Sequence, residues 1–380
     1  MYTLKLDGSE IAKSAGGDIA FESGTLLERV GAAGVLSCVL LPENPHWGWI
    51  ALRASVVTLE RDGEEIFRGQ AVDKRLNENG FFELSALGDM SYLKDVLIAP
   101  FTYTGTLSDV VGQILGYYNT GASSWRKIYK GTVEFSGSIT YELTSYRSAW
   151  DCINDLVNTY GGVLEMRWLS DGTRGIDWLT DSHRYSRQPA LWGDNLLSLE
   201  IENDASNVIN RLICEGDGNV VLNAVDSDSQ SKYGRIYGYQ RFNGISNADA
   251  LLAAGQAAVA KMKQEARTVS GRAIDKWQEG MRDFKPFRPG DFIRAVSQIH
   301  LLDEWLVCSE LRHDLTEAKP VQVTLGRIGE SLTDSTRTGL INVWIGSTQG
   351  TQPPSIKAKD ANAVYAKSGG EYAVALELEG

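Results

Sequence analysis

Four histidines are the residues of this 380-residue chain that could serve as a general base: His46, His183, His300 and His313. A nucleophilic serine or cysteine needs such a base, together with a carboxylate that orients it. The sequence has no G-x-S-x-G or H-E-x-x-H motif and no G-x-x-x-x-G-K followed by Ser or Thr, which removes the usual signs of hydrolases, metalloproteases and nucleotide-binding loops. We therefore expect surface or strand histidines, and we predict a non-enzymatic protein without catalytic residues.

Cysteines and clustered carboxylates are the other residues that could react or bind a metal ion. The cysteines are far apart and form no C-x-x-C pair: Cys38, Cys152, Cys214 and Cys308. We expect buried reduced thiols, since no histidine stands at zinc-ligand spacing beside them. Asp226 with Asp228, and Glu215 with Asp217, could attract calcium, but the ligand pattern of an EF-hand is missing. Solvated loops are the favoured interpretation, so we predict no metal ion and no cofactor.

Aromatic side chains gather in the turn Pro45-His-Trp-Gly-Trp49. Exposed tryptophans of this kind stack on sugars or fill a pocket of a protein partner. Most of the 10 Trp and 15 Tyr are expected in cores or subunit interfaces. We predict Trp47 and Trp49 as possible partner contacts, with saccharide binding as the less favoured alternative.

The composition is that of a folded protein, with 43% hydrophobic and 23% charged residues. A formal net charge of −12 argues against specific nucleic-acid binding, which usually needs a basic face. The N-terminal residues lack the basic and apolar regions of a signal peptide, and no apolar run reaches about 18 residues. We expect no membrane insertion, and synthesis and folding in a bacterial or host cytoplasm.

Residues 1–97 show short apolar or alternating runs separated by turns, which predict antiparallel strands. The dipeptides Asp62-Gly63 and Asn79-Gly80 are strong hairpin signals, because both accept positive φ. We predict a small β-barrel here. The expected strands are 2–6, 19–22, 35–41, 56–60, 65–68 and 81–85.

Residues 98–193 change to an α+β pattern. Thr106 and Asp109 can cap a helix whose apolar residues, from Leu107 to Tyr118, repeat with helical spacing. A second helix is predicted from about 145 to 160 and ends at Gly161-Gly162. A hairpin of strands 163–168 and 175–179, joined by a turn at 170–173, follows directly. We therefore predict an α+β helix-hairpin domain.

Residues 194–334 return to strands, and we predict a second small antiparallel β-barrel with an inserted helix at about 246–268. Asn247 or Ser246 is the expected helix cap. The predicted strands are 197–202, 208–215, 219–222, 291–296, 304–311 and 320–327. The last stretch, 335–380, is rich in Thr, Ser, Gly and Gln and includes Pro353-Pro354, so a C-terminal arm or linker is expected.

Three stretches resemble the phage tail hub family, which includes siphophage tail-associated proteins and the baseplate hubs of contractile tails. The first is Leu59–Val72 with Leu87–Asp95, which is similar to the end of the first barrel of that family. The second is Tyr146–Trp168, the helix, Gly-Gly stop and following strand. The third is Phe287–Arg294 with Val307–Leu315, which resembles the close of the second barrel. The order of these stretches carries more weight than any one of them.

This resemblance implies a homotrimer at the virion tail tip, assembled in the bacterial host cytoplasm. Two related barrels per chain would give six around a DNA-ejection channel, matching a hexameric tail tube. The implied partners are tail-tube, distal tail and tape-measure proteins and a spike or fibre. Two alternatives remain open: a tail-borne hydrolase of cell wall or capsule, and a receptor-binding β protein that uses Trp47 and Trp49.

Overall fold

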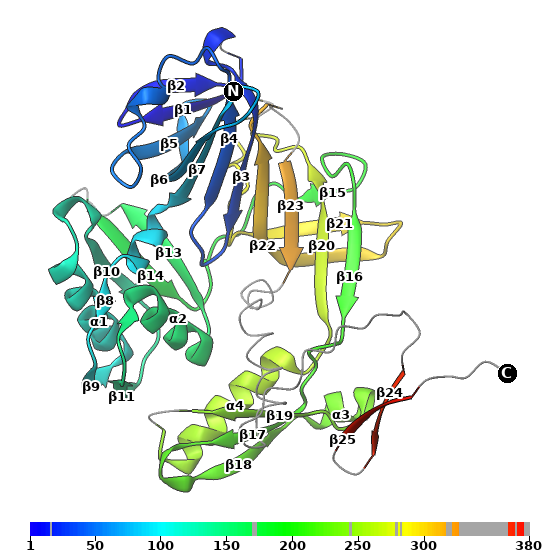
Figure 1. The fold of residues 1–380 in the computed structure, drawn as a ribbon. Helices are drawn as coiled ribbons and strands as arrows, with labels where there is room; N and C mark the ends of the chain where they lie inside the picture. Colours follow the sequence, from blue (N-terminus) through cyan, green and yellow to red (C-terminus); the bar gives the residue numbers. More distant parts are fainter. Residues whose placement is uncertain are drawn as a thin grey trace. The chain divides into compact units, whose positions relative to one another are not determined.

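The computed structural model is mostly β with a few helices, and its chain divides into two compact units, Met1–Thr338 and Gly339–Gly380 (Figure 1). The two units are described separately. The structure describes residues 1–15, 17–168, 173–242, 245–277, 280–281, 283–316, 321–326, 364–368 and 371–375.

The first part of the chain forms seven strands: β1 Tyr2–Leu6, β2 Ser9–Lys13, β3 Phe21–Arg29, β4 Val35–Leu40, β5 Val56–Arg61, β6 Glu64–Leu76 and β7 Phe82–Gly88. Successive side chains of a strand point to opposite faces of the sheet, which decides which of them are buried. Tyr2, Leu4 and Leu6 of β1 point into the core, while the residues between them are partly exposed. The predicted turn at Asp62-Gly63 joins β5 to β6, with φ of 51° and 85°. Each predicted strand overlaps an observed one, but the strand expected at 19–22 begins only at Phe21, β2 was not predicted, and β3 and β6 extend well beyond their predicted ends.

The next part contains two helices, α1 Leu107–Gly121 and α2 Ala149–Tyr160. Thr106 and Asp109 form the predicted capping box of α1, and Ser148 caps α2. Gly161 and Gly162 leave α2 with φ of 82° and 85°, which favours glycine. The strands of this part are β8 Leu97–Ile98, β9 Phe101–Thr106, β10 Ile128–Val133, β11 Ser138–Leu143, β12 Arg147–Ser148, β13 Val163–Trp168 and β14 Arg174–Leu179.

The predicted hairpin of this part is confirmed as β13 and β14, which pair from Val163↔Leu179 to Trp168↔Arg174. Most of its turn, 169–172, lies outside the described residues. Strand β10 adds to β14 in parallel, giving a three-stranded sheet in the order β10-β14-β13. Both helices and this sheet share one apolar core. Cys152 is buried in that core, and the other three cysteines are likewise buried and free, as predicted.

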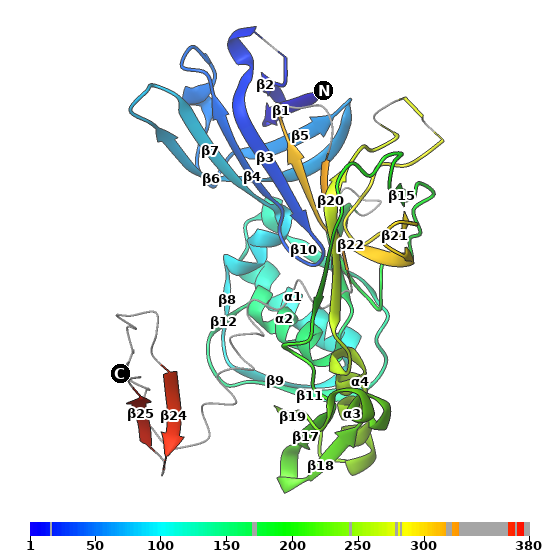
Figure 2. The same cartoon turned by 90° about the vertical axis from the view of Figure 1, so that its right-hand side faces the viewer.

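A single 13-stranded sheet links the first part to the later strands β15 Ala190–Leu191, β16 Glu200–Asp204, β20 Ala266–Ala273, β21 Phe292–Ser297, β22 Leu302–Asp314 and β23 Val321–Gly326. The connection is the antiparallel pair β22–β3, from Glu310↔Arg29 to Asp314↔Thr25; the two strands lie side by side in Figures 1 and 2. The main strand path runs open from β2 to β16, and no sheet closes into a barrel in the described part of the chain. The prediction of two separate barrels is therefore not confirmed.

The insertion between β16 and β20 is larger than the predicted helix. It holds β17 Arg211–Glu215, β18 Val221–Val225, α3 Ser227–Tyr233, β19 Tyr237–Arg241 and α4 Ala248–Met262. The strands predicted at 208–215 and 219–222 do not join the large sheet; they form their own sheet, in the order β18-β17-β19. The predicted helix ends early, at Met262, because residues from Ala266 onward pair with β16 as strand β20.

The second unit shows two described strands, β24 Val364–Ser368 and β25 Glu371–Ala375, which pair antiparallel. They are the described residues of the predicted arm or linker at 335–380, and its Pro353-Pro354 lies outside the described residues. In the parts of the chain that the structure does describe, no helix combines the length and apolarity needed to span a membrane.

Helix α4 lies close against its sheet because of Gly255. A Cβ at this position would stand 2.4 Å from Cys214 Sγ and 3.0 Å from Ala224 Cβ. We expect Gly255→Ala to lower the free energy of unfolding by about 1–2 kcal/mol through overpacking. The control is Gly116→Ala on α1, where a Cβ meets nothing within 4 Å; this change should stabilise by about 0.5–1 kcal/mol. Urea unfolding measures the change in the free energy of unfolding for both variants. Changes of the same sign would contradict the packing of α4 described above.

Candidate functional site

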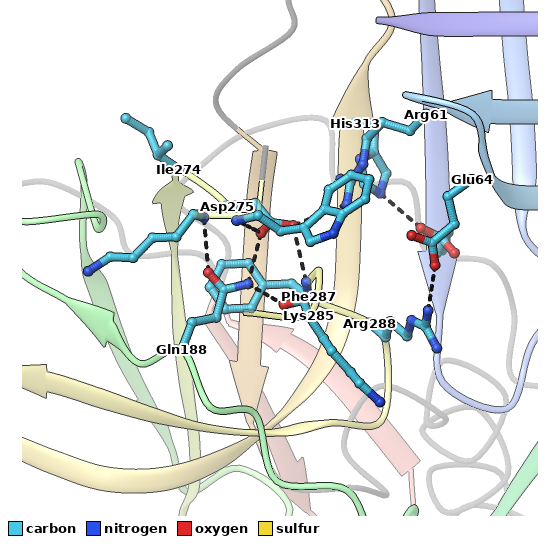
Figure 3. Close-up of polar contacts among 12 residues, drawn as sticks. Arg61, Glu64, Gln188, Ile274, Asp275, Lys285, Phe287, Arg288 and His313 are labelled. Carbon is cyan, nitrogen blue, oxygen red and sulfur yellow. Dashed lines mark hydrogen bonds and ion pairs between the residues drawn. The ribbon is translucent and has the colours of Figure 1, made fainter. Parts of the chain in front are cut away.

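A buried polar network joins β5 of the first part to the end of β20. Asp275, which has no solvent exposure, accepts hydrogen bonds from Arg61 Nη2 at 3.1 Å and from Gln188 Nε2 at 2.8 Å (Figure 3). The backbone N–H groups of Trp277 and Phe287 donate to the same carboxylate, each at 3.1 Å. Both carboxylate oxygens are therefore satisfied, as a buried charge requires.

Gln188 extends this network to a third segment. Its Nε2 also donates to the carbonyl of Lys285 at 2.7 Å, and its Oε1 accepts from the N–H of Lys276 at 3.0 Å. The guanidinium of Arg61 lies 5.4 Å from the ring of Trp277. Segments around residues 61, 188, 275 and 286 are thus fixed to one another through a single carboxylate.

His313 on β22 forms a second polar link to the first part of the chain. Its Nε2 lies 2.8 Å from Glu28 Oε2 and its Nδ1 lies 3.2 Å from Tyr2 Oη. The ring is 2% exposed. This histidine therefore ties β22 to β1 and β3.

The remaining histidines also have ordinary structural contacts. His183 is bound by Glu134, and this hydrogen bond raises the pKa of the imidazole. His300 Nδ1 lies 2.7 Å from Ser297 Oγ within one turn, yet no carboxylate bonds His300 among the described residues. His46 packs against Trp49 at 4.3 Å between ring centroids. Among the described residues, no histidine is hydrogen-bonded both to a serine or cysteine and to a carboxylate.

A cavity of about 700 Å³ lies where the first part, the helix-hairpin part and the 286–289 loop meet. Its walls include the turn 31–34 and strands β6 and β13. Seven arginines and five carboxylates line it. Most of these arginines are held by ion pairs, including Arg184 with Glu165 at 2.6 Å and Arg288 with Glu64 at 2.7 Å. Several of these ion pairs, such as Arg288 with Glu64, therefore join separate parts of the chain, while Arg68 with Glu65 is a local pair within β6.

Arginine side chains and aromatic rings alternate from the wall of this cavity, at Arg68, Trp168 and Arg174, to Tyr92 and Arg126 beyond it. The guanidiniums of Arg68 and Arg174 lie 4.9 and 5.0 Å from the ring of Trp168. Arg174 also lies 5.1 Å from the ring of Tyr92, and Arg126 lies 5.4 Å from it. Burial raises the pKa of Tyr92 to about 12, so the phenol stays neutral. Arg68 belongs to β6 and Arg174 to β14. Their contacts with Trp168 therefore hold the first part of the chain against the helix-hairpin part.

The two tryptophans predicted as partner contacts differ in their surroundings. Trp47 stacks on Phe82 with ring centroids 4.6 Å apart, and Lys74 Nζ lies 5.6 Å from its ring. Trp49 is 56% exposed. Trp47 thus packs against the first core, while Trp49 has the exposure that a partner contact needs.

Two of the carboxylates considered for calcium, Asp226 and Glu215, have protein partners. Asp226 caps α3 through Ser229 N–H and lies 2.9 Å from Lys263 Nζ, contacts that lower the pKa of this carboxyl. Glu215 lies 3.3 Å from Arg241 Nη1. Within the described ranges no group of three or more metal-ligating side chains exists. These loops are organised by caps and ion pairs.

Comparison with known proteins gives a shared fold. No family model and no curated protein matches the sequence. Among solved structures, a tail protein from Neisseria meningitidis MC58 has a TM-score of 0.62 at 15% identity, with 86% of this chain and 97% of that chain covered. The 43 kDa tail protein of prophage MuSo2 from Shewanella oneidensis gives 0.61 at 12%, covering 86% and 98%. Prophage tail protein gp18 from Listeria monocytogenes EGD-e gives 0.60 at 11%, covering 90% and 99%.

These matches confirm the resemblance in fold to phage tail proteins, over most of the chain. Sequence reasoning missed the Arg61–Asp275 network. The sequence did contain a signal for Arg61. This residue follows Val57 and Leu59 at every second position of β5, on the side that faces the core, where a charge needs a buried partner. Nothing in the sequence pointed to a residue 214 positions away as that partner.

The network generates a prediction with a matched control. Asp275→Ala leaves Arg61 buried without its partner, so we expect the free energy of unfolding to fall by about 3–5 kcal/mol. Glu64→Ala removes the exposed pair with Arg288, which links the same two parts of the chain, and should cost less than about 1 kcal/mol. Urea unfolding at neutral pH compares the two variants. Equal losses would mean that Asp275 does not organise this junction.

Proposed function

We propose that the protein is a structural component of a phage or prophage tail, a homotrimeric hub at the tail tip. In this role it closes the tail tube, attaches distal spike or fibre components and forms a channel for DNA ejection. The observation that carries the proposal is the shared fold with three tail proteins, which spans nearly their whole length. Its partners would be tail-tube, distal tail and tape-measure proteins.

The open ends of the large sheet support assembly with further copies. Strands β2 and β16 end the main path, and each has one edge without a partner strand among the described residues. A neighbouring copy can cover such edges, which otherwise invite uncontrolled pairing. We propose that the two barrels expected per chain are completed in this way, around a three-fold axis. The division at 1–97, 98–193, 194–334 and 335–380 belongs to this proposal.

The acidic composition suits a channel component. A chain with a net charge of −12 offers few cations to passing phosphates, so DNA is not retained. The interior geometry supports a non-enzymatic role, because the polar groups of the junction bind one another. The alternative of a cell-wall or capsule hydrolase gains no support from the histidine contacts.

Solution mass tests the hub proposal. We expect the purified chain at micromolar concentration to form assemblies containing a multiple of three chains, with ring-shaped particles visible by electron microscopy. Multi-angle light scattering after gel filtration measures the mass. A monomer without rings would contradict the hub.

Receptor binding is a second candidate, favoured by the exposure of Trp49 beside Leu52, which is 43% exposed. If this turn binds a host surface, Trp49→Ala should reduce binding of the chain to host cells at least tenfold, since buried aromatic anchors dominate such contacts. Leu76→Ala is the control, because this side chain is 63% exposed at the end of β6. Binding unchanged by Trp49→Ala, or lost equally in both variants, would remove this candidate.

A further inference from the structure

The three-stranded sheet of the insertion has an open edge at β18. Its order is β18-β17-β19, and no described strand pairs with the outer side of β18. Figure 1 shows β18 at the border of this part of the chain. Helix α4 covers one face of the sheet, over the buried side chains of Leu212, Cys214 and Ala224.

The hydrogen bonds at both ends of the β17–β18 ladder show which groups are free. Gly216 N–H donates to the carbonyl of Val220, and Asp226 N–H donates to that of Asn210. Because bonded pairs alternate along an antiparallel ladder, Leu222 and Ala224 direct their backbone groups toward β17. The backbone groups of Val221, Asn223 and Val225 therefore point to the open edge.

This edge carries none of the charges that protect the ends of the large sheet. Strand β16 has Glu200 and Glu202 exposed, and β2 has Glu10 and Lys13 joined by an ion pair at 2.6 Å. In contrast, β18 is Val-Leu-Asn-Ala-Val, with Val221 61% and Val225 45% exposed. An uncharged, β-branched edge without proline favours pairing with another strand.

We propose that β18 pairs with β18 of a second copy of this chain, antiparallel about a two-fold axis at Asn223. The sequence is nearly palindromic around this residue, so the register sets Val221 opposite Val225 and Leu222 opposite Ala224. Every residue then keeps its face: the valines stay on the outer face and Leu222 and Ala224 stay under the helices. The free backbone groups of Val221, Asn223 and Val225 are all used.

Helix α4 fits the same arrangement. It packs on β17 and β18, so two copies of it would run about two strand spacings apart, roughly 10 Å. This is the distance at which helices pack through small side chains. The contact would therefore bring the two α4 helices side by side on one face of the joined sheet, as well as cover the open edge.

The two-fold contact goes beyond the proposed hub. It uses the insertion, whereas three-fold assembly is assigned to the large sheet, so it joins two copies without closing a ring of three. Free chains would pair as dimers, and trimers would pair into assemblies of six chains. Each case has its own mass in solution.

Disulfide trapping of full-length Asn223→Cys tests the contact. Directly opposed residues that exchange backbone hydrogen bonds have Cα atoms about 5.5 Å apart, within the 4.4–6.8 Å that a disulfide spans. We expect mild oxidation to convert most of the chain to a two-chain band on a non-reducing denaturing gel. Wild type should give no such band, since its four cysteines are buried. Tyr237→Cys, exposed on the opposite edge strand β19, is the control and should stay as single chains.

Charged side chains on the edge give an independent readout. Val221→Lys with Val225→Lys should halve the native mass and leave the far-ultraviolet circular dichroism spectrum unchanged, because both valines are exposed and their replacement leaves the fold intact. A fall from six chains to three supports both this contact and the hub. A fall from two to one supports the contact and contradicts the trimer. A trimeric mass in both proteins, or no cross-linked band with Asn223→Cys, overturns the two-fold contact and leaves the hub proposal standing.

Discussion

The buried carboxylate of Asp275 is the constraint around which the large sheet and its surrounding loops are arranged. An ionised group without solvent exposure is tolerated only when its hydrogen-bonding capacity is met. Asp275 meets it with an arginine from the first part, a glutamine from the start of the later strands, and two backbone N–H groups of its own loop. Because these donors come from distant stretches of the chain, satisfying one charge fixes the position of all of them.

Around this junction, the polar side chains bind one another and hold separate stretches of the chain together. The cavity is lined by arginines that face carboxylates and aromatic rings, and His313 is held between Glu28 and Tyr2. Such interactions stabilise contacts between parts of one chain and leave the surface free to bind other proteins.

Local features of the fold could be predicted from sequence, and long-range pairing could not. The cap of α1 by Thr106 and Asp109 and the hairpin after Gly161-Gly162 depend on neighbours within a few residues, and both are present. The joining of β3 to β22 depends on residues nearly 300 positions apart, and strand patterns say nothing about such partners. The insertion was underestimated for the same reason: β17 and β18 have the alternation of barrel strands, and only their pairing with β19 reveals a separate sheet. For the site, the role of Trp49 as a partner contact stays a prediction, and Asp275 was missed because its partner Arg61 lies 214 positions away.

The pairing of β3 with β22 has a consequence for synthesis. Strands β3 and β4 can pair as soon as residues up to 40 have left the ribosome, but Arg29 must wait for Glu310, 281 residues later, before the outer edge of β3 is covered. Translation at about 5–20 residues per second leaves that edge open for roughly 15–60 seconds. During this interval the nascent chain carries an unpaired strand edge, the feature that most readily captures other chains. Elongation rate and chaperone access should therefore govern the yield of native protein more strongly than the stability of the finished sheet.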